Sequence, residues 1–143
     1  MIIPVREYPA VAAALVVACA VEVGIRTMRL PRLARAVGAP LRQGAGDDAW
    51  SRSQPELGVH GRRQARAVRR VMRHWPFGDT CLRHALVTGH RLRRLHPELV
   101  VGVAKVDGEI KAHAWLAFDG TRLYDPLAAA RSYVTLGPSP EDA

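Results

Sequence analysis

The stretch KAHAWLAFDGTRLYD, residues 111–125, decides the fold that the sequence predicts. It consists of an apolar, β-rich run, a turn signal at Asp119-Gly120 and a second short run, which is typical of an antiparallel hairpin. Two polar side chains, His113 and Asp125, stand at mirrored positions in this apolar hairpin. Histidine and aspartate are uncommon in a core without a partner, so their placement indicates a pair with a chemical role.

The length of the turn decides whether this pair can form. A two-residue turn at Asp119-Gly120 would place His113 and Asp125 on opposite faces of the hairpin. A three-residue turn, Phe118-Asp119-Gly120, with the glycine in the left-handed position, places them directly opposite each other. Opposed side chains share a face, with Cβ atoms about 4.5–5.5 Å apart. We therefore predict the three-residue turn and a carboxylate that holds the imidazole.

The hairpin continues a longer strand region. The run ELVVGVAKV, residues 98–106, precedes it, and the turn signals VDGE and FDGT separate this run from residues 112–118 and 121–125. Short β-rich runs separated by Asp-Gly turns predict a three-stranded antiparallel meander. The tail GPSPEDA, residues 137–143, is expected to be frayed.

The residues before the sheet are predicted to be mainly helical. Residues 9–37 have a helical pattern that Pro31 divides in two, and residues 61–75 form an amphipathic helix that Pro76 stops. Between these helices, residues 42–58 are rich in Gly, Ser, Asp and Pro, which indicates a loop.

Helices followed by strands predict an α+β fold, with a helical N-terminal part packed on a small antiparallel sheet. The length of 143 residues is typical of one domain with one core. We therefore interpret residues 1–143 as a single domain, with a mainly helical part at 1–75 and a core that carries the polar residues at 76–136.

A further helix is predicted from Cys81 to Leu95, where Pro97 closes it. Asp79 or Thr80 can cap its first amide groups. A thiol in the first turn of a helix lies at the positive end of the helix dipole, which favours the thiolate. The first-turn amides also lack intrahelical partners, so the N–H of Cys81 can help to hold an oxyanion.

Cys81, His113 and Asp125 together form a complete acyl-transfer set. The histidine takes the thiol proton and returns it to a leaving amine, and the aspartate fixes the tautomer of the histidine. Each residue also has a structural explanation: a buried inert thiol, a hydrogen-bonded histidine in a sheet, or an aspartate that caps a turn. His84, three residues after Cys81, is a rival base on the same helix.

The motifs around these residues resemble a known family. CLRHAL from residue 81, LVVGV from 99, AHAW from 112 and an aspartate twelve residues after the histidine are similar to the lasso-peptide leader peptidases. These are the stand-alone catalytic halves of the B protein of lasso-peptide biosynthesis, with a transglutaminase-like, papain-related core. The match covers about residues 77–126.

The resemblance implies a cysteine protease in which Cys81 is the nucleophile, His113 the general base and acid, and Asp125 the orienting residue. The implied reaction is hydrolysis of one peptide bond, which releases a leader peptide from a ribosomally made precursor. It also implies a separate leader-recognition protein and a lasso cyclase that closes the ring on the freed core. The family often has a glycine where the nucleophile helix ends, whereas this chain has Leu95-His96-Pro97.

The chain is strongly basic, which favours anionic partners. Its formal net charge is +8, and all but two of its 21 basic residues are arginine. The arginines of residues 62–73 lie largely off the apolar stripe of their helix, so this face is expected to meet an acidic part of the leader or of the recognition partner, or to be only solvated. Nucleic acid is not expected, because aromatic stacking platforms are not evident.

The apolar stretch Ala10 to Val21 is short of the roughly 20 residues that cross a bilayer. We predict a buried helix and no transmembrane segment, with docking on a membrane or a partner as the alternative. Cys19, inside this stretch, is expected to be a small buried hydrophobe. The two cysteines suggest no disulfide framework, so a cytoplasmic location is expected.

No cofactor or metal is expected, because the chain has no C-x-x-C, no H-x-x-x-H beside an acid and no phosphate-binding glycine loop. Two other functions stay open. One is a transglutaminase-like or arylamine acetyltransferase-like acyltransferase that uses the same three residues. The other is a non-catalytic basic module that binds peptide or nucleic acid.

Overall fold

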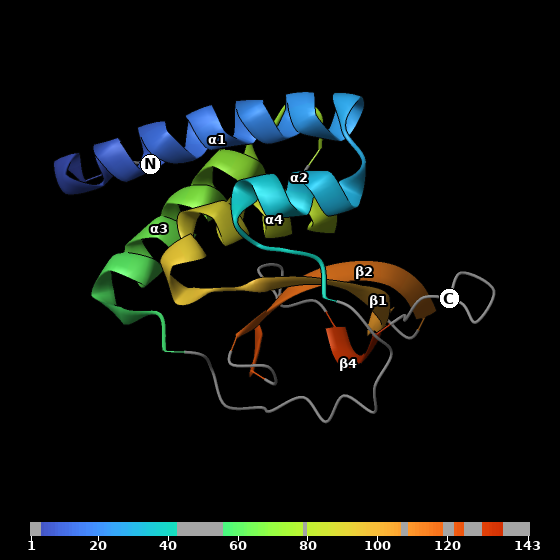
Figure 1. The fold of residues 1–143 in the computed structure, drawn as a ribbon. Helices are drawn as coiled ribbons and strands as arrows, with labels where there is room; N and C mark the ends of the chain where they lie inside the picture. Colours follow the sequence, from blue (N-terminus) through green and yellow to red (C-terminus); the bar gives the residue numbers. More distant parts are fainter. Residues whose placement is uncertain are drawn as a thin grey trace.

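Helices cover one face of an antiparallel sheet in the computed structural model of the chain (Figure 1). The structure describes residues 4–42, 56–78, 80–106, 109–118, 122–124 and 130–135. Within these ranges the helices are η1 (Val5–Glu7), α1 (Tyr8–Thr27), α2 (Leu30–Val37), α3 (Gly58–Arg73), α4 (Cys81–Arg91) and η2 (Arg93–Leu95). The strands are β1 (Glu98–Val106), β2 (Glu109–Phe118), β3 (Arg122–Tyr124) and β4 (Ala130–Thr135). The α+β architecture that the sequence predicts is confirmed.

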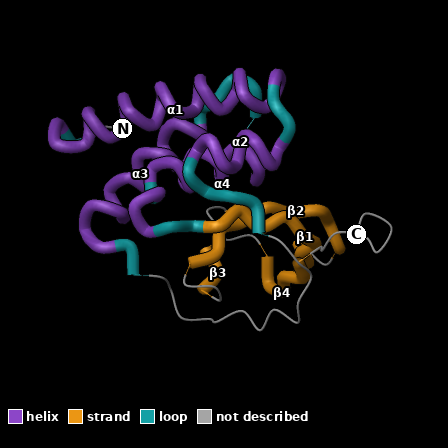
Figure 2. The backbone as a smooth tube through the Cα atoms, viewed as in Figure 1, coloured by secondary structure: helices purple, strands orange, loops and turns teal. Residues whose placement is uncertain are grey.

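The elements form layers, with α4 next to the sheet and α1 on the outside. α4 packs on β2 and also contacts α1, α2 and α3, and α1 crosses the outer side of this helix layer (Figure 1). The loop after α2, teal in Figure 2, runs down to the sheet, where Leu41 forms a parallel bridge with Leu99. The start of α4, where Cys81 lies, is therefore fixed between the outer helices and the central strands.

The sheet contains a strand that the predicted meander lacks. Its described strands lie in the order β3-β2-β1-β4, and all neighbours are antiparallel. The fourth strand, ARSYVT, pairs with β1 through Gly102 and Thr135 among others. It pairs with a strand almost 30 residues earlier in the chain, and such a distant pairing is not visible in the local sequence pattern.

The predicted register of the β2–β3 hairpin is wrong by two residues. Tyr124 pairs with Leu116, and Phe118 pairs with Arg122, whereas the predicted turn would have paired Tyr124 with Ala114. Phe118 belongs to the strand and not to the turn, because its ring is buried and packs edge-on against Tyr124 with centroids 6.2 Å apart. A shift of two residues keeps every side chain of β3 on its predicted face.

The core lies between α4 and the face of the sheet that carries Ala114, Leu116 and Phe118. At Gly89 on α4 the packing requires glycine, because an added Cβ would lie 2.7 Å from the Cβ of Ala39. The other face of the sheet carries a second, smaller cluster of Val100, Trp115 and Ala117. His113 belongs to this second face by strand alternation.

The helix α1 differs from the buried helix that the sequence predicts. It buries small residues toward the molecule, but Leu15, Val16 and Val23 are exposed, and so is Cys19, which was expected to be buried. The helical stretch Val5–Thr27 is also apolar and long enough to cross a membrane by length and composition, with a mean hydropathy of 2.0. Core helices of soluble proteins and signal sequences meet the same criterion, and this helix packs against α3 and α4 along its other side.

The connection from α4 to β1 turns at a histidine. α4 ends at Arg91, a short 3-10 helix follows, and His96 then takes a left-handed backbone conformation with φ of 55°. Pro97 comes next and cannot continue a helix. The chain therefore turns at His96 in the left-handed conformation that glycine adopts most easily.

Candidate active site

Cys81 is the first residue of α4, as the sequence predicts. Thr80 caps the helix with its side-chain oxygen, which accepts a hydrogen bond of 3.3 Å from the backbone N–H of Arg83. Asp79, the other predicted cap, lies outside the described residues. The thiol of Cys81 is half-buried at the positive end of the helix, where the dipole favours a negative sulfur.

The structure brings Cys81 and His113 together. A hydrogen bond from the side chain of His113 is the main cause that lowers the pKa of Cys81 below its usual 9.0, and the charge of the imidazole lowers this pKa further. Burial of the sulfur opposes both effects. A thiol with a lowered pKa beside an imidazole is the arrangement that makes a cysteine nucleophilic near neutral pH.

Two backbone amides complete the surroundings of the sulfur. Hydrogen bonds from the backbone of Ala114 and Leu82 also lower the pKa of Cys81. Because the amides of a strand lie in the plane of its sheet, the bond from Ala114 places the sulfur beside the edge of β2. Among the described pairs, β3 covers only the part of β2 from Leu116 to Phe118, and the amide of Ala114 bonds the sulfur instead.

His113 is held on the far face of the sheet by its neighbours. Its imidazole is buried and stacks on the ring of Trp115, with centroids 6.1 Å apart and planes inclined by 26°. The two residues share this face, as strand alternation requires. Gly102 lies opposite His113 on β1 and contributes no side chain to that face, which leaves the space across from the imidazole without a neighbouring strand side chain.

Asp125, the third predicted residue, lies outside the described residues. Tyr124, which directly precedes it in the chain, pairs with Leu116 and not with Ala114. The predicted one-to-one pairing of His113 with Asp125 rested on the register that the structure corrects.

His84, the rival base, is buried on α4 one turn after Cys81. The groups that lower the pKa of Cys81 are His113, Ala114 and Leu82. The histidine that acts on the sulfur is therefore His113 on the strand, and His84 on the helix is a buried residue of the core.

A buried carboxylate that the sequence analysis did not single out anchors the start of α4. Glu22 on α1 accepts hydrogen bonds from Arg83 Nε at 2.7 Å and Nη2 at 3.1 Å, and from Trp75 Nε1 at 3.2 Å. Arg26 adds an ion pair at 3.3 Å. These partners, Arg83 first, lower the pKa of Glu22 to about 2. Arg83 stands two residues after Cys81, so the network fixes the turn that carries the thiol.

The sequence contains an indication of this network, but it has two possible interpretations. Glu22 is the acidic residue that ends an apolar stretch, and such a residue faces either water or a buried cation. Its hydrogen-bond partners, Trp75 just after α3 and Arg83 on α4, lie 53 and 61 residues away in the chain. Only the folded arrangement shows which of the two settings applies.

Comparison with known proteins gave one family match. The family model described as the transglutaminase-like superfamily matches residues 12–137, most of the chain. The chain belongs to the transglutaminase-like superfamily. No match was found among curated proteins or among solved structures. The transglutaminase-like match includes Cys81, His113 and Asp125 as well as the helices that position α4.

Proposed function

We propose that this transglutaminase-like protein is a cysteine peptidase that cleaves the leader from a ribosomally synthesised lasso-peptide precursor. The observation that carries the chemistry is the hydrogen bond between His113 and Cys81, with its lowered thiol pKa. Membership in the superfamily supports cysteine protease or acyltransferase chemistry. The choice of substrate rests on the motifs at residues 81–86, 99–103 and 112–115.

The proposed reaction uses the thiolate as nucleophile. The sulfur of Cys81 attacks the carbonyl carbon of the scissile peptide bond, and its proton passes to His113. The oxyanion of the tetrahedral intermediate accepts a hydrogen bond from the first-turn N–H of Cys81. When the C–N bond breaks, His113 returns the proton to the leaving amine, and the acyl part remains as a thioester.

Water completes the cycle. His113 takes a proton from a water molecule that attacks the thioester carbonyl, and the thiolate leaves as the carboxylic acid forms. Asp125 is proposed to fix the imidazole tautomer in both half-reactions. The stacking of His113 on Trp115 supports this scheme, because it restricts the ring to one orientation and limits the access of bulk water to it.

The proposal includes a partner and a compartment. A separate recognition protein holds the leader, and a cyclase uses the released core. The precursor is made on the ribosome, so we place the reaction in the cytoplasm, where the free thiols Cys19 and Cys81 would stay reduced.

Mass spectrometry of a candidate precursor tests the proposal. The precursor is incubated with the protein and its recognition partner, and the expected products are the leader and the core, with one peptide bond cut. Cys81→Ala should abolish cleavage and leave leader-dependent association intact, while Cys19→Ser serves as the matched control that cleaves normally. Full cleavage by the Cys81→Ala protein would remove the hypothesis.

Superfamily membership supports acyl transfer as much as hydrolysis. The two are distinguished by the fate of the thioester in H₂¹⁸O with an added primary amine such as methylamine. A peptidase incorporates ¹⁸O into the new carboxylate. An acyltransferase instead gives the methylamide as the main product at low amine concentration.

A further inference from the structure

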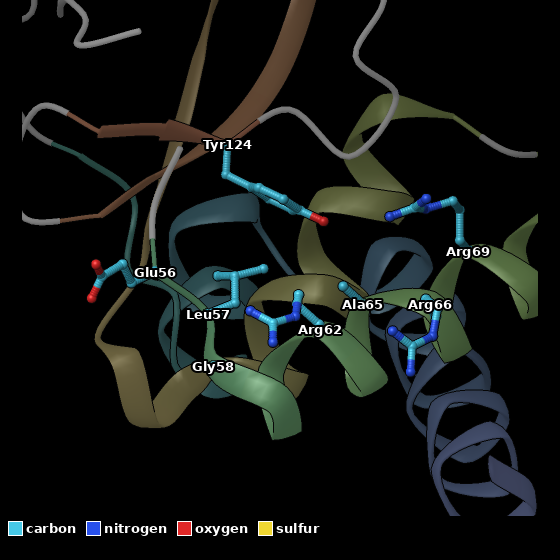
Figure 3. Close-up of a pocket in the computed structure, with 8 residues that line it drawn as sticks. All are labelled: Glu56, Leu57, Gly58, Arg62, Ala65, Arg66, Arg69 and Tyr124. Carbon is cyan, nitrogen blue, oxygen red and sulfur yellow. The ribbon is translucent and has the colours of Figure 1, made fainter. Parts of the chain in front are cut away.

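A pocket with a volume of about 690 Å³ lies between α3 and the edge strand β3 (Figure 3). Neither Cys81 nor His113 is among its described lining residues. Its lining has a basic side and an apolar side. It is formed by Glu56, Leu57, Gly58, Arg62, Ala65, Arg66, Arg69 and Tyr124.

The basic side comes from one face of α3. Arg62, Arg66 and Arg69 follow helical spacing, so their guanidinium groups line the same side of the pocket (Figure 3). Arg66 forms an ion pair with Glu7 at 3.2 Å. Within the ranges that the structure describes, no ion pair compensates Arg62 or Arg69. The pocket thus holds positive charge that the described part of the chain does not neutralise.

This distribution revises the interpretation of the basic helix. Arg70 also forms an ion pair with Glu7, so two of the arginines first considered for partner binding already serve an internal contact. Of the three arginines that line the pocket, Arg66 is engaged by Glu7, and Arg62 and Arg69 carry the charge that the described residues leave uncompensated. Among the described lining residues the only carboxylate is Glu56, which is exposed and points away from the guanidinium groups (Figure 3).

The apolar side is suited to a peptide. The ring of Tyr124 leans over the pocket with its hydroxyl toward Arg69, and Leu57 and Ala65 lie on the helix side (Figure 3). Guanidinium groups bind carboxylates with directed, charge-assisted hydrogen bonds, and the apolar walls accept the aliphatic part of a chain. The volume is within the range of pockets that hold small ligands or a few residues.

We propose that this pocket binds an acidic side chain of the peptide substrate and sets its position relative to the thiol. The inference rests on the proposed peptidase function. Tyr124 pairs with Leu116, which lies about 10 Å along β2 from His113 and carries its side chain on the opposite face of the strand. An extended peptide covers about 3.3 Å per residue, so a glutamate or aspartate about three to five residues from the scissile bond reaches the arginines.

Peptide binding to the Cys81→Ala protein tests the pocket without turnover. The probes are a ten-residue peptide with two central glutamates between leucine and alanine residues, and its analogue with glutamine at both positions. At low salt the acidic peptide should bind about tenfold more tightly, and high salt should remove most of the difference. Isothermal titration calorimetry gives both affinities.

Variants assign the preference to the pocket. Arg62→Ala with Arg69→Ala should abolish the preference for the acidic peptide, and Arg62→Lys with Arg69→Lys should retain part of it because the charge remains. Arg29→Ala with Arg35→Ala, which removes two exposed arginines at α2, is the matched control and should keep the full preference. Thermal unfolding of each variant shows that the fold is retained.

Three results overturn the inference: equal affinity for the two peptides, an unchanged preference in the pocket variant, or loss of the preference in the α2 control. Binding of a ten-nucleotide single-stranded RNA that the pocket variant loses, without any binding of the acidic peptide, also overturns it and indicates a phosphate site. None of these results depends on cleavage. The peptidase proposal fails separately, when the precursor stays intact with the unmodified protein and its partner.

Discussion

The side chain of His113 on β2 hydrogen-bonds the thiol of Cys81, which lies 32 residues earlier at the first turn of α4. This hydrogen bond connects the helix layer to the sheet. The sulfur belongs to the helix layer, and the imidazole lies on the far face of the sheet. The backbone amide of Ala114 at the edge of β2 also donates a hydrogen bond to the sulfur of Cys81. The reactivity of the cysteine is therefore a property of the packing of helix on sheet.

Removal of the imidazole should slow alkylation of Cys81 at neutral pH. The hydrogen bond from His113 is the largest cause that lowers the thiol pKa, so the thiolate forms at lower pH than in an ordinary cysteine. In a Cys19→Ser background, His113→Ala should shift the pH–rate profile for iodoacetamide upward. The rate at pH 7 then falls about tenfold for each pKa unit regained. Superimposable profiles would contradict the role of His113.

Loss of the carboxylate at position 125 should reduce the rate and spare the fold. By analogy with the serine triad, Asp125→Asn leaves the histidine in the wrong tautomer and lowers single-turnover cleavage by about 10⁴. Circular dichroism checks that the fold is kept, and Asp119→Asn, six residues earlier in the chain, is the matched control. A rate within a few fold of the unmodified protein would show that another group orients the imidazole.

Glu22→Gln should lower the melting temperature near pH 7 but not in strong acid. The pKa of Glu22 is lowered to about 2, chiefly by its hydrogen bond with Arg83, so the carboxylate stabilises the fold above its usual pKa of 4.5. This stabilisation is lost as the pH falls from about 4.5 to about 2, and the melting curves of the two proteins should converge there. A difference in melting temperature between the two proteins that stays constant over this pH range would show that the Glu22 side chain stabilises the fold by its shape and not by its charge.

Gly89→Ala should destabilise the protein although alanine favours helices. The new Cβ would lie 2.7 Å from the Cβ of Ala39, and overpacking of this kind costs about 1–3 kcal/mol, which exceeds the helix gain of about 1 kcal/mol. Urea unfolding measures the difference. Ala39→Gly added to Gly89→Ala should restore part of the stability, and a double variant no more stable than the single one would locate the strain elsewhere.

The elements that the sequence predicts well are those with local signals. Pro31 divides α1 from α2, Thr80 caps the helix that starts at Cys81, and His113 and Trp115 share a face by strand alternation. Each of these rests on residues within a few positions of one another, where backbone sterics and capping decide the outcome.

The elements that it misses depend on distant contacts. β4 pairs with a strand almost 30 residues earlier, and Phe118 extends β2 because its ring is buried against Tyr124. Cys19 is exposed because the other helices cover the opposite side of α1. The hydrophobicity of the stretch alone does not show which side they cover. Local sequence patterns indicate whether a segment is a helix or a strand, but the segments against which it pairs or packs are decided by contacts between distant parts of the chain.

The bonds of Glu22 also link the outer helix to the nucleophile mechanically. Through Arg83, α1 holds the same turn of α4 from which the sulfur projects, while the opposite side of α1 presents Leu15, Val16 and Val23 to the surroundings. A force that slides or tilts α1 must either break those bonds or carry the sulfur with it. A movement of α1 is therefore transmitted through Glu22 and Arg83 to the helical turn that carries Cys81.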